Sequence, residues 1–118
     1  MPETLKIVVY VPETHADAVR EAMGKADAGL IGDYKYTSFS VKGTGRFIPM
    51  KNAHPSIGKI GELTEVAEER IETACLRKDL DKIIEAIKSV HPYEEVAIDV
   101  FPLLLDPNTI TKNKLRNK

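Results

Sequence analysis

The chain has 118 residues, with 17 Lys and Arg against 18 Asp and Glu, which fits one globular domain rather than a disordered chain. The net charge of −1 provides no basic field, which argues against a nucleic-acid-binding protein. A lone cysteine, Cys75, excludes an internal disulfide or a zinc site with paired cysteines. Because no apolar run approaches the ~20 residues that span a bilayer, we expect a cytoplasmic protein without membrane contact.

The first part of the chain predicts a strand, a helix and a second strand. Residues 5–11 are apolar and largely β-branched, which favours a strand. Residues 13–28 repeat their apolar side chains with a helical period, and residues 34–41 alternate as a strand does. Val8 and Tyr10 lie opposite the other apolar side chains of the first strand, so we expect something, such as another subunit, to cover that face of the sheet.

The second part of the chain opens with about twenty residues rich in Gly and Pro, which predict a long loop and therefore a candidate functional segment. Residues 62–76 predict a long strand, with a bulge or bend near Ala67 where the alternation breaks. Residues 78–90 predict an amphipathic helix and residues 95–104 a last strand. We expect one domain over residues 1–105, followed by a basic, flexible or solvated tail over residues 106–118.

The order β-α-β-β-α-β predicts a ferredoxin-like α+β sandwich, an antiparallel sheet with two helices on one face. RNA-recognition domains share this order but need stacking aromatic side chains on their sheet. The strand expected around residues 69–75 has no aromatic residue and is acidic. The sequence therefore predicts no nucleic-acid partner.

Five motifs stand in one order along the chain: VPE at 11–13, AGLIGDY at 28–34, GTGRFIP at 43–49, NAHPSIG at 52–58 and HPYEEVAIDVFPL at 91–103. Together they resemble the YqfO insert domain of the Nif-three-like family, whose members carry the label GTP cyclohydrolase 1 type 2 homologue. The HPYE element also resembles the CutA family. The resemblance implies a CutA/PII-like module standing by itself and assembling as a homo-oligomer, with a trimer favoured. The family's metal ligands lie outside the matched region, so no catalytic residue carries over.

Two groups of residues are candidates for a site. His91, Glu94 and Glu95 combine an imidazole with two carboxylates, which suits a divalent metal such as Zn²⁺ or Cu²⁺; the alternative is that His91 and Pro92 simply end the helix. The loop candidates for ligand contact are Gly43, Gly45, Arg46 and His54. For His54 the alternative is an ordinary surface turn.

These observations favour a binding or regulatory module over an enzyme. Its ligand would be a metal ion, a small molecule or a protein. One alternative is a metal-assisted hydrolase of the Nif-three-like type, with a site at subunit interfaces built from the HPYE element. The other alternative is a purely structural oligomerisation domain.

Overall fold

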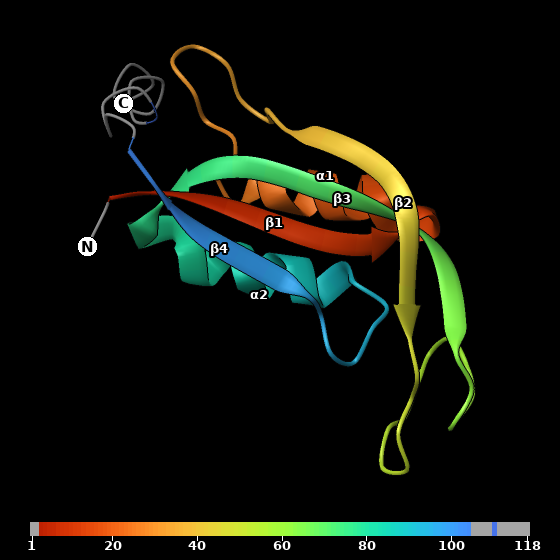
Figure 1. The fold of residues 1–118 in the computed structure, drawn as a ribbon. Coiled ribbons are helices and arrows are strands. Elements are labelled where there is room, and N and C mark those ends of the chain that lie inside the picture. Colours follow the sequence, from red (N-terminus) through yellow and green to blue (C-terminus); the bar gives the residue numbers. More distant parts are fainter. Residues whose placement is uncertain (1–2, 105–109, 111–118) are drawn as a thin grey trace.

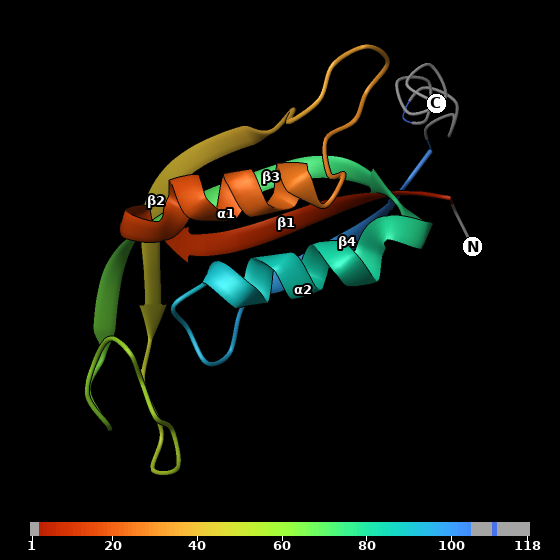
Figure 2. The ribbon, with the colours of Figure 1, turned by 180° about the vertical axis from the view of Figure 1, so that it is seen from behind.

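The protein is a four-stranded sheet with both helices on one face (Figures 1 and 2). The computed structural model describes residues 3–104 and residue 110. In chain order the elements are β1 (Thr4–Pro12), α1 (Ala16–Lys25), β2 (Phe39–Phe47), β3 (Thr64–Leu76), α2 (Leu80–Val90) and β4 (Ile98–Leu103). The strands lie in the order β2-β3-β1-β4, and every neighbouring pair is antiparallel. The predicted ferredoxin-like α+β fold is confirmed.

The core fills the space between the sheet and the two helices. One face of β1 is apolar throughout, and the stripe of α2 that the sequence predicted faces it. Ile83 and Ile87 of α2 are completely buried, whereas Leu80, Ile84 and Val90 are partly buried against the same cluster. The other completely buried members of the cluster are Ile7, Val9, Val11, Val19, Ile71 and Cys75.

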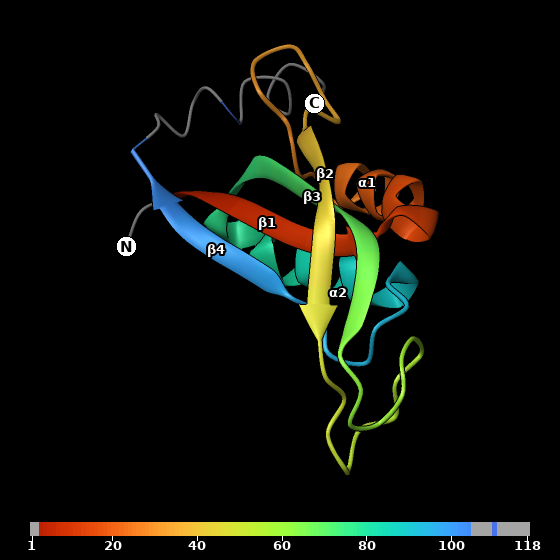
Figure 3. The same ribbon diagram turned by 45° about the vertical axis from the view of Figure 1, so that its right-hand side comes forward.

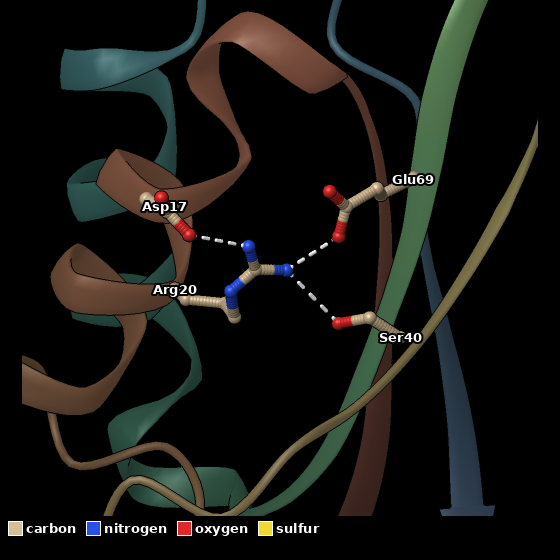
Figure 4. A network of polar contacts seen from close by, with 4 residues as sticks. All are labelled: Asp17, Arg20, Ser40 and Glu69. Carbon is tan, nitrogen blue, oxygen red and sulfur yellow. Dashed lines mark hydrogen bonds and ion pairs between the residues drawn. The ribbon is translucent and has the colours of Figure 1, made fainter.

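An ion-pair network fastens α1 to the sheet (Figure 4). The Arg20 guanidinium donates from Nη1 to Glu69 Oε1 of β3 at 2.6 Å and to Ser40 Oγ of β2 at 3.0 Å. Its Nη2 donates to Asp17 Oδ1 at 2.6 Å, one turn earlier on the helix. Hydrogen bonds from Arg20 to Asp17 and Glu69 raise the pKa of this guanidinium above its ordinary value. One side chain of α1 thus contacts both β2 and β3.

The first helix is shorter than the predicted span of 13–28. A 3₁₀ turn at Glu13–His15 precedes α1, and a similar turn at Arg77–Asp79 precedes α2. At the other end of α1, Asp27 adopts a φ of +77°, which an α-helix cannot continue. Asp27 also accepts a hydrogen bond from Lys82 Nζ of α2 at 2.7 Å, so the end of α1 is tied to the neighbouring helix.

The strand predicted over residues 34–41 is wrong in its position, since β2 covers Phe39–Phe47. Tyr36 has a φ of +60°, and its ring occupies the space that a side chain at Gly24 would fill. The Thr37 amide donates to the Gly29 carbonyl at 3.1 Å, and Thr73 Oγ1 donates to the Thr37 carbonyl at 2.6 Å. These long-range contacts hold residues 34–38 as a connection, although their side chains alternate like a strand.

The β2–β3 hairpin extends beyond the helices and curves away from the rest of the sheet (Figures 1 and 3). Gly43 and Gly45 lie inside β2, so their assignment to a loop is wrong. The register with β3 runs without interruption from Phe39, opposite Glu72, to Phe47, opposite Thr64. The two strands therefore bend together without a bulge at Ala67, where the sequence predicted a bulge or a bend. This bend directs the hairpin toward the connection between α2 and β4.

The face of the sheet that points away from the helices is called the second face here. Val8 lies on this face and is 0% exposed within the chain, so no partner is needed to bury it. The register places Val8 opposite Glu72, whose carboxylate pairs with Lys6 at 3.2 Å on the same face. The burial of Val8 within the chain therefore lends no support to a covering subunit, and the expectation that something covers this face stays a prediction. Phe39 and Phe101 also lie on this face by register, and they are 63% and 45% exposed.

The end of this second face near Leu76 is closed by a small cluster. Ile110 is buried there with Leu30, Ala74 and Leu76, and Leu103 packs against them. The expected flexible tail over 106–118 otherwise lies outside the described residues. At Ile110 itself the structure shows burial rather than solvation.

Candidate functional site

A pocket of about 480 Å³ lies where the far end of the β2–β3 hairpin approaches the connection between α2 and β4. One wall is formed by residues 45–50, 53 and 55–57, and the other by residues 93–95 and 97. Tyr10 of β1 and Glu68 of β3 complete the lining. Three motifs quoted for the family resemblance, at 43–49, 52–58 and 91–103, thus meet around one cavity although the first and the last are far apart in the sequence.

A chain of hydrogen bonds fixes the α2–β4 connection beside this pocket. His91 Nδ1 accepts the Tyr93 amide at 3.2 Å, so the neutral ring carries its proton on Nε2 and donates it to the Tyr10 carbonyl at 2.7 Å. The Tyr93 hydroxyl then donates to Glu68 Oε2 at 2.7 Å. This chain joins β1, the connection and β3, and holds the Tyr93 ring at the pocket wall.

The titration behaviour of these groups follows from their burial. Desolvation lowers the pKa of His91 below its ordinary value, although the Tyr10 carbonyl and the charge of Glu68 act in the opposite direction. Desolvation, with a hydrogen bond to Glu68 and the charge of Glu68, raises the pKa of the Tyr93 phenol. At neutral pH the ring of His91 is therefore neutral and the phenol of Tyr93 keeps its proton.

Gly45 makes room for the carboxylate of Glu68. A Cβ atom at this position would overlap the carboxylate oxygens, because the Glu68 side chain crosses over β2 at Gly45. Glu68 is 9% exposed and Gly45 lines the same pocket. The missing side chain at Gly45 therefore leaves the space that the Glu68 carboxylate occupies, whereas the sequence pattern had placed this glycine in a loop. Nothing lies within 4 Å of a Cβ built at Gly43, which is absent from the pocket lining.

The two walls of the pocket are joined by a polar contact at the rim. The His54 amide donates to Glu94 Oε1 at 2.7 Å, so the 48–63 segment is attached to the HPYE element. Across the hairpin, Arg46 Nε donates to Glu65 Oε2 at 2.7 Å. Phe47 packs edge-on against Tyr93, with ring centroids 5.7 Å apart. The rim is thus held by the backbone of His54 and the aromatic pair.

The proposed metal ligands do not form a metal-binding group. Within residues 3–104 and 110, no cluster of three or more His, Cys, Asp and Glu side chains is arranged to hold a metal ion. His91 uses both ring nitrogens in hydrogen bonds, while Glu94 and Glu95 are exposed at the pocket rim. A metal at His91 would have to displace either Tyr10 or Tyr93, so these residues do not fit that role as they stand.

The loop candidates divide into two kinds. Gly45 and Arg46 line the pocket, and His54 contributes its backbone amide to the rim through Glu94. Gly43 is exposed on β2, outside the cavity lining. Sequence reasoning missed Glu68 and Tyr93, whose hydrogen bond joins β3 to the α2–β4 connection. Glu68 gives no local signal because it is one of several acidic residues on its strand, and its pairing spans 25 positions.

No helix in the described part of the chain has both the length and the apolar character needed to cross a membrane.

The comparisons with known proteins agree with the motifs. No family model matches the chain. A GTP cyclohydrolase 1 type 2 homolog of Halalkalibacterium halodurans is 48% identical over 105 residues, which cover 89% of this chain but 28% of that protein. The solved structure of a Bacillus cereus protein related to NIF3 is 46% identical and superposes with a TM-score of 0.77, covering 88% of this chain and 26% of that chain.

The resemblance to the Nif-three-like family is thereby confirmed, and the chain spans 28% of the length of its Halalkalibacterium relative. The periplasmic divalent cation tolerance protein CutA of Archaeoglobus fulgidus superposes with a TM-score of 0.66 over 98% of this chain and 99% of that chain, at 10% identity. At this identity the likeness establishes the fold, which is the CutA/PII-like sandwich.

Proposed function

We propose that this chain is a binding module whose pocket takes a small molecule. The observation that carries the proposal is the cavity of about 480 Å³ between the β2–β3 hairpin and the α2–β4 connection. Ligand sites are typically concave, mainly apolar and largely pre-formed, with a few placed polar groups. This cavity has apolar walls from Ile48, Pro49 and Ile57, and its polar groups, Glu68 and Tyr93, are held by a hydrogen bond.

Binding accounts for the state of the polar groups better than acid–base catalysis does. A general base needs a free acceptor in reach of the substrate and a pKa near the working pH. The acceptor nitrogen of His91 already accepts the Tyr93 amide, and the raised pKa of Tyr93 keeps the phenol protonated. Both groups therefore serve to position the pocket wall.

Fragment screening by amide chemical shifts tests this proposal. We expect small aromatic fragments to shift the amides of residues 45–50 and 93–97. The variant Ala97→Trp places a large ring at the pocket lining and should abolish the shifts, whereas Ala18→Trp, exposed on α1, should preserve them. A screen in which no fragment shifts the pocket amides, or in which both variants behave alike, would contradict the proposal.

A second role, assembly of copies of this chain, is favoured by the second sheet face. Phe39, Val41 and Phe101 are 63%, 49% and 45% exposed there, a degree of apolar exposure that self-association would relieve. We propose that copies pair through this face, in the trimer that the family resemblance implies.

Sedimentation equilibrium and native mass spectrometry at micromolar concentration measure this assembly directly. We expect three chains, converted to monomers by Val41→Glu and left intact by Tyr34→Glu, since Tyr34 is exposed outside the sheet. A wild-type monomer would exclude the assembly, and an oligomer unaffected by Val41→Glu would exclude this face.

A further inference from the structure

We infer that the pocket selects ligands that carry an ammonium or a similar N–H cation on an apolar body. This inference rests on the proposed binding function and adds the chemical class of the ligand. It is built from the Glu68 carboxylate, from the other charges of the lining and from the apolar walls.

The first observation is an incompletely partnered carboxylate at the pocket. Glu68 is 9% exposed, and its Oε2 accepts the Tyr93 hydroxyl at 2.7 Å. Oε1 has no hydrogen-bond partner among the described residues. In this part of the chain every fully buried side-chain oxygen has a partner, so Oε1 is not fully buried and keeps access to solvent. Oε1 also lies next to Gly45, and both Gly45 and Glu68 line the cavity, so we place this access on the pocket side. A largely desolvated carboxylate gains most from a charged N–H donor.

The second observation is the balance of charge around the cavity. Three carboxylates line it, from Glu68, Glu94 and Glu95, against one guanidinium, that of Arg46. Arg46 is already paired with Glu65 outside the lining at 2.7 Å. The charges of the lining side chains therefore sum to a negative value, which favours a cation over a phosphate or a carboxylate ligand.

The third observation is the apolar surface that surrounds these charges. Phe47 and Tyr93 form an edge-to-face pair at 5.7 Å, and both rings line the pocket. Ile48 and Met50 line it as well while remaining 54% and 77% exposed. An apolar ligand body would cover these side chains, and aromatic rings near a cation add a further attraction.

The experiment compares three probes of one shape and different charge: 2-phenylethylammonium, 2-phenylethanol and 3-phenylpropionate. Each is titrated into the full chain at pH 7 by calorimetry and by amide shifts. We expect the ammonium to bind at least about tenfold more tightly than the alcohol, the gain typical of a hydrogen bond to a charged group. The carboxylate should bind more weakly than the alcohol.

The variants assign this preference to named residues. Glu68→Gln keeps the shape of the side chain and should remove most of the ammonium advantage, while Glu85→Gln, on the exposed side of α2, should leave it unchanged. If Glu68→Gln does not fold, the double variant Glu94→Gln with Glu95→Gln changes exposed residues and should still lower the advantage several-fold.

The outcomes separate this inference from the function on which it rests. Binding of the alcohol or the carboxylate in the pocket with no ammonium preference overturns the cation selectivity and leaves the binding pocket intact. An ammonium preference unaffected by either the Glu68 variant or the double variant also overturns it. If no probe shifts the pocket amides, the proposed function fails together with the inference.

Discussion

The core and the far end of the hairpin use similar apolar residues in different ways. Between the helices and the sheet, Ile71, Ile83 and Ile87 are all 0% exposed. At the far end of the hairpin, Ile48 is 54% exposed, and it lines a cavity instead of filling one. The difference arises because both helices cover only the central part of the sheet, and the hairpin extends past them (Figure 2). Apolar side chains beyond the helices stay partly exposed instead of being buried in the core, and a bound ligand can cover them.

The test with the largest expected effect truncates one isoleucine in the core and one at the far end of the hairpin. Ile87→Ala leaves a cavity in the core and should lower the free energy of unfolding by ~2–5 kcal/mol. Ile48→Ala removes a half-exposed side chain and should change it by no more than ~0.5 kcal/mol. Urea denaturation followed by circular dichroism measures both values. Similar losses at the two positions would show that the hairpin end is part of the core.

The next test uses the two glycines of β2. Gly45→Ala forces its new methyl group against the Glu68 carboxylate and should destabilise the chain by ~1–3 kcal/mol. Gly43→Ala meets nothing within 4 Å on the same strand, so it should be neutral or stabilise by ~0.4–1 kcal/mol through the unfolded state. Thermal denaturation of the pair provides the comparison, and equal effects would contradict the close approach of Glu68.

A comparable effect is expected from the hydrogen bond that joins Tyr93 of the α2–β4 connection to Glu68 of β3. Tyr93→Phe removes the donor to Glu68 Oε2 and leaves a buried carboxylate short of one partner, at a cost of ~1–3 kcal/mol. The matched change Tyr34→Phe, at a residue 74% exposed, should have no measurable effect. If the cost of Tyr93→Phe in denaturation experiments disappears when Glu68→Ala has already removed the acceptor, that cost belongs to this pair. A cost that persists in the Glu68→Ala background would contradict the assignment.

The smallest effect is a pH dependence from His91. Burial holds its folded pKa below the ordinary value of 6.5, so the unfolded chain binds more protons between the two pKa values. The stability from the neutral ring is complete above about pH 6.5 and is lost as the pH falls from 6.5 through the folded pKa. The stability advantage of the wild type over His91→Gln should therefore shrink between about pH 7.5 and about pH 5.5. An advantage that grows on acidification would reverse the assigned sign.

The elements with strong periodicity were predictable from the sequence. The i, i+3, i+4 stripe of α2 and the apolar face of β1 each describe one side of one element, and both face the core as predicted. The position of β2 was not predictable in this way. Residues 34–38 alternate like a strand, yet the contacts of Tyr36 with Gly24 and of Thr37 with Gly29 and Thr73 hold them outside the sheet.

The candidate site was predictable in part, because some of its residues stand in contiguous motifs of the sequence. The HPYE element and the GTGRFIP segment could be identified as motifs, and both line the pocket. Their chemistry could not be identified, because His91, expected as a metal ligand, uses its two nitrogens to hold the backbone of Tyr10 and Tyr93.

The sequence by itself determined the order of the elements, the faces of β1 and α2 that enter the core and the kinship with the Nif-three-like proteins, because these depend on local patterns along the chain. The tertiary structure decided the direction in which the hairpin points, the cavity beneath it and the pairing of Glu68 with Tyr93 across 25 positions. A contact between distant residues depends on how strands and connections are placed in space, and no periodicity along the chain records that placement.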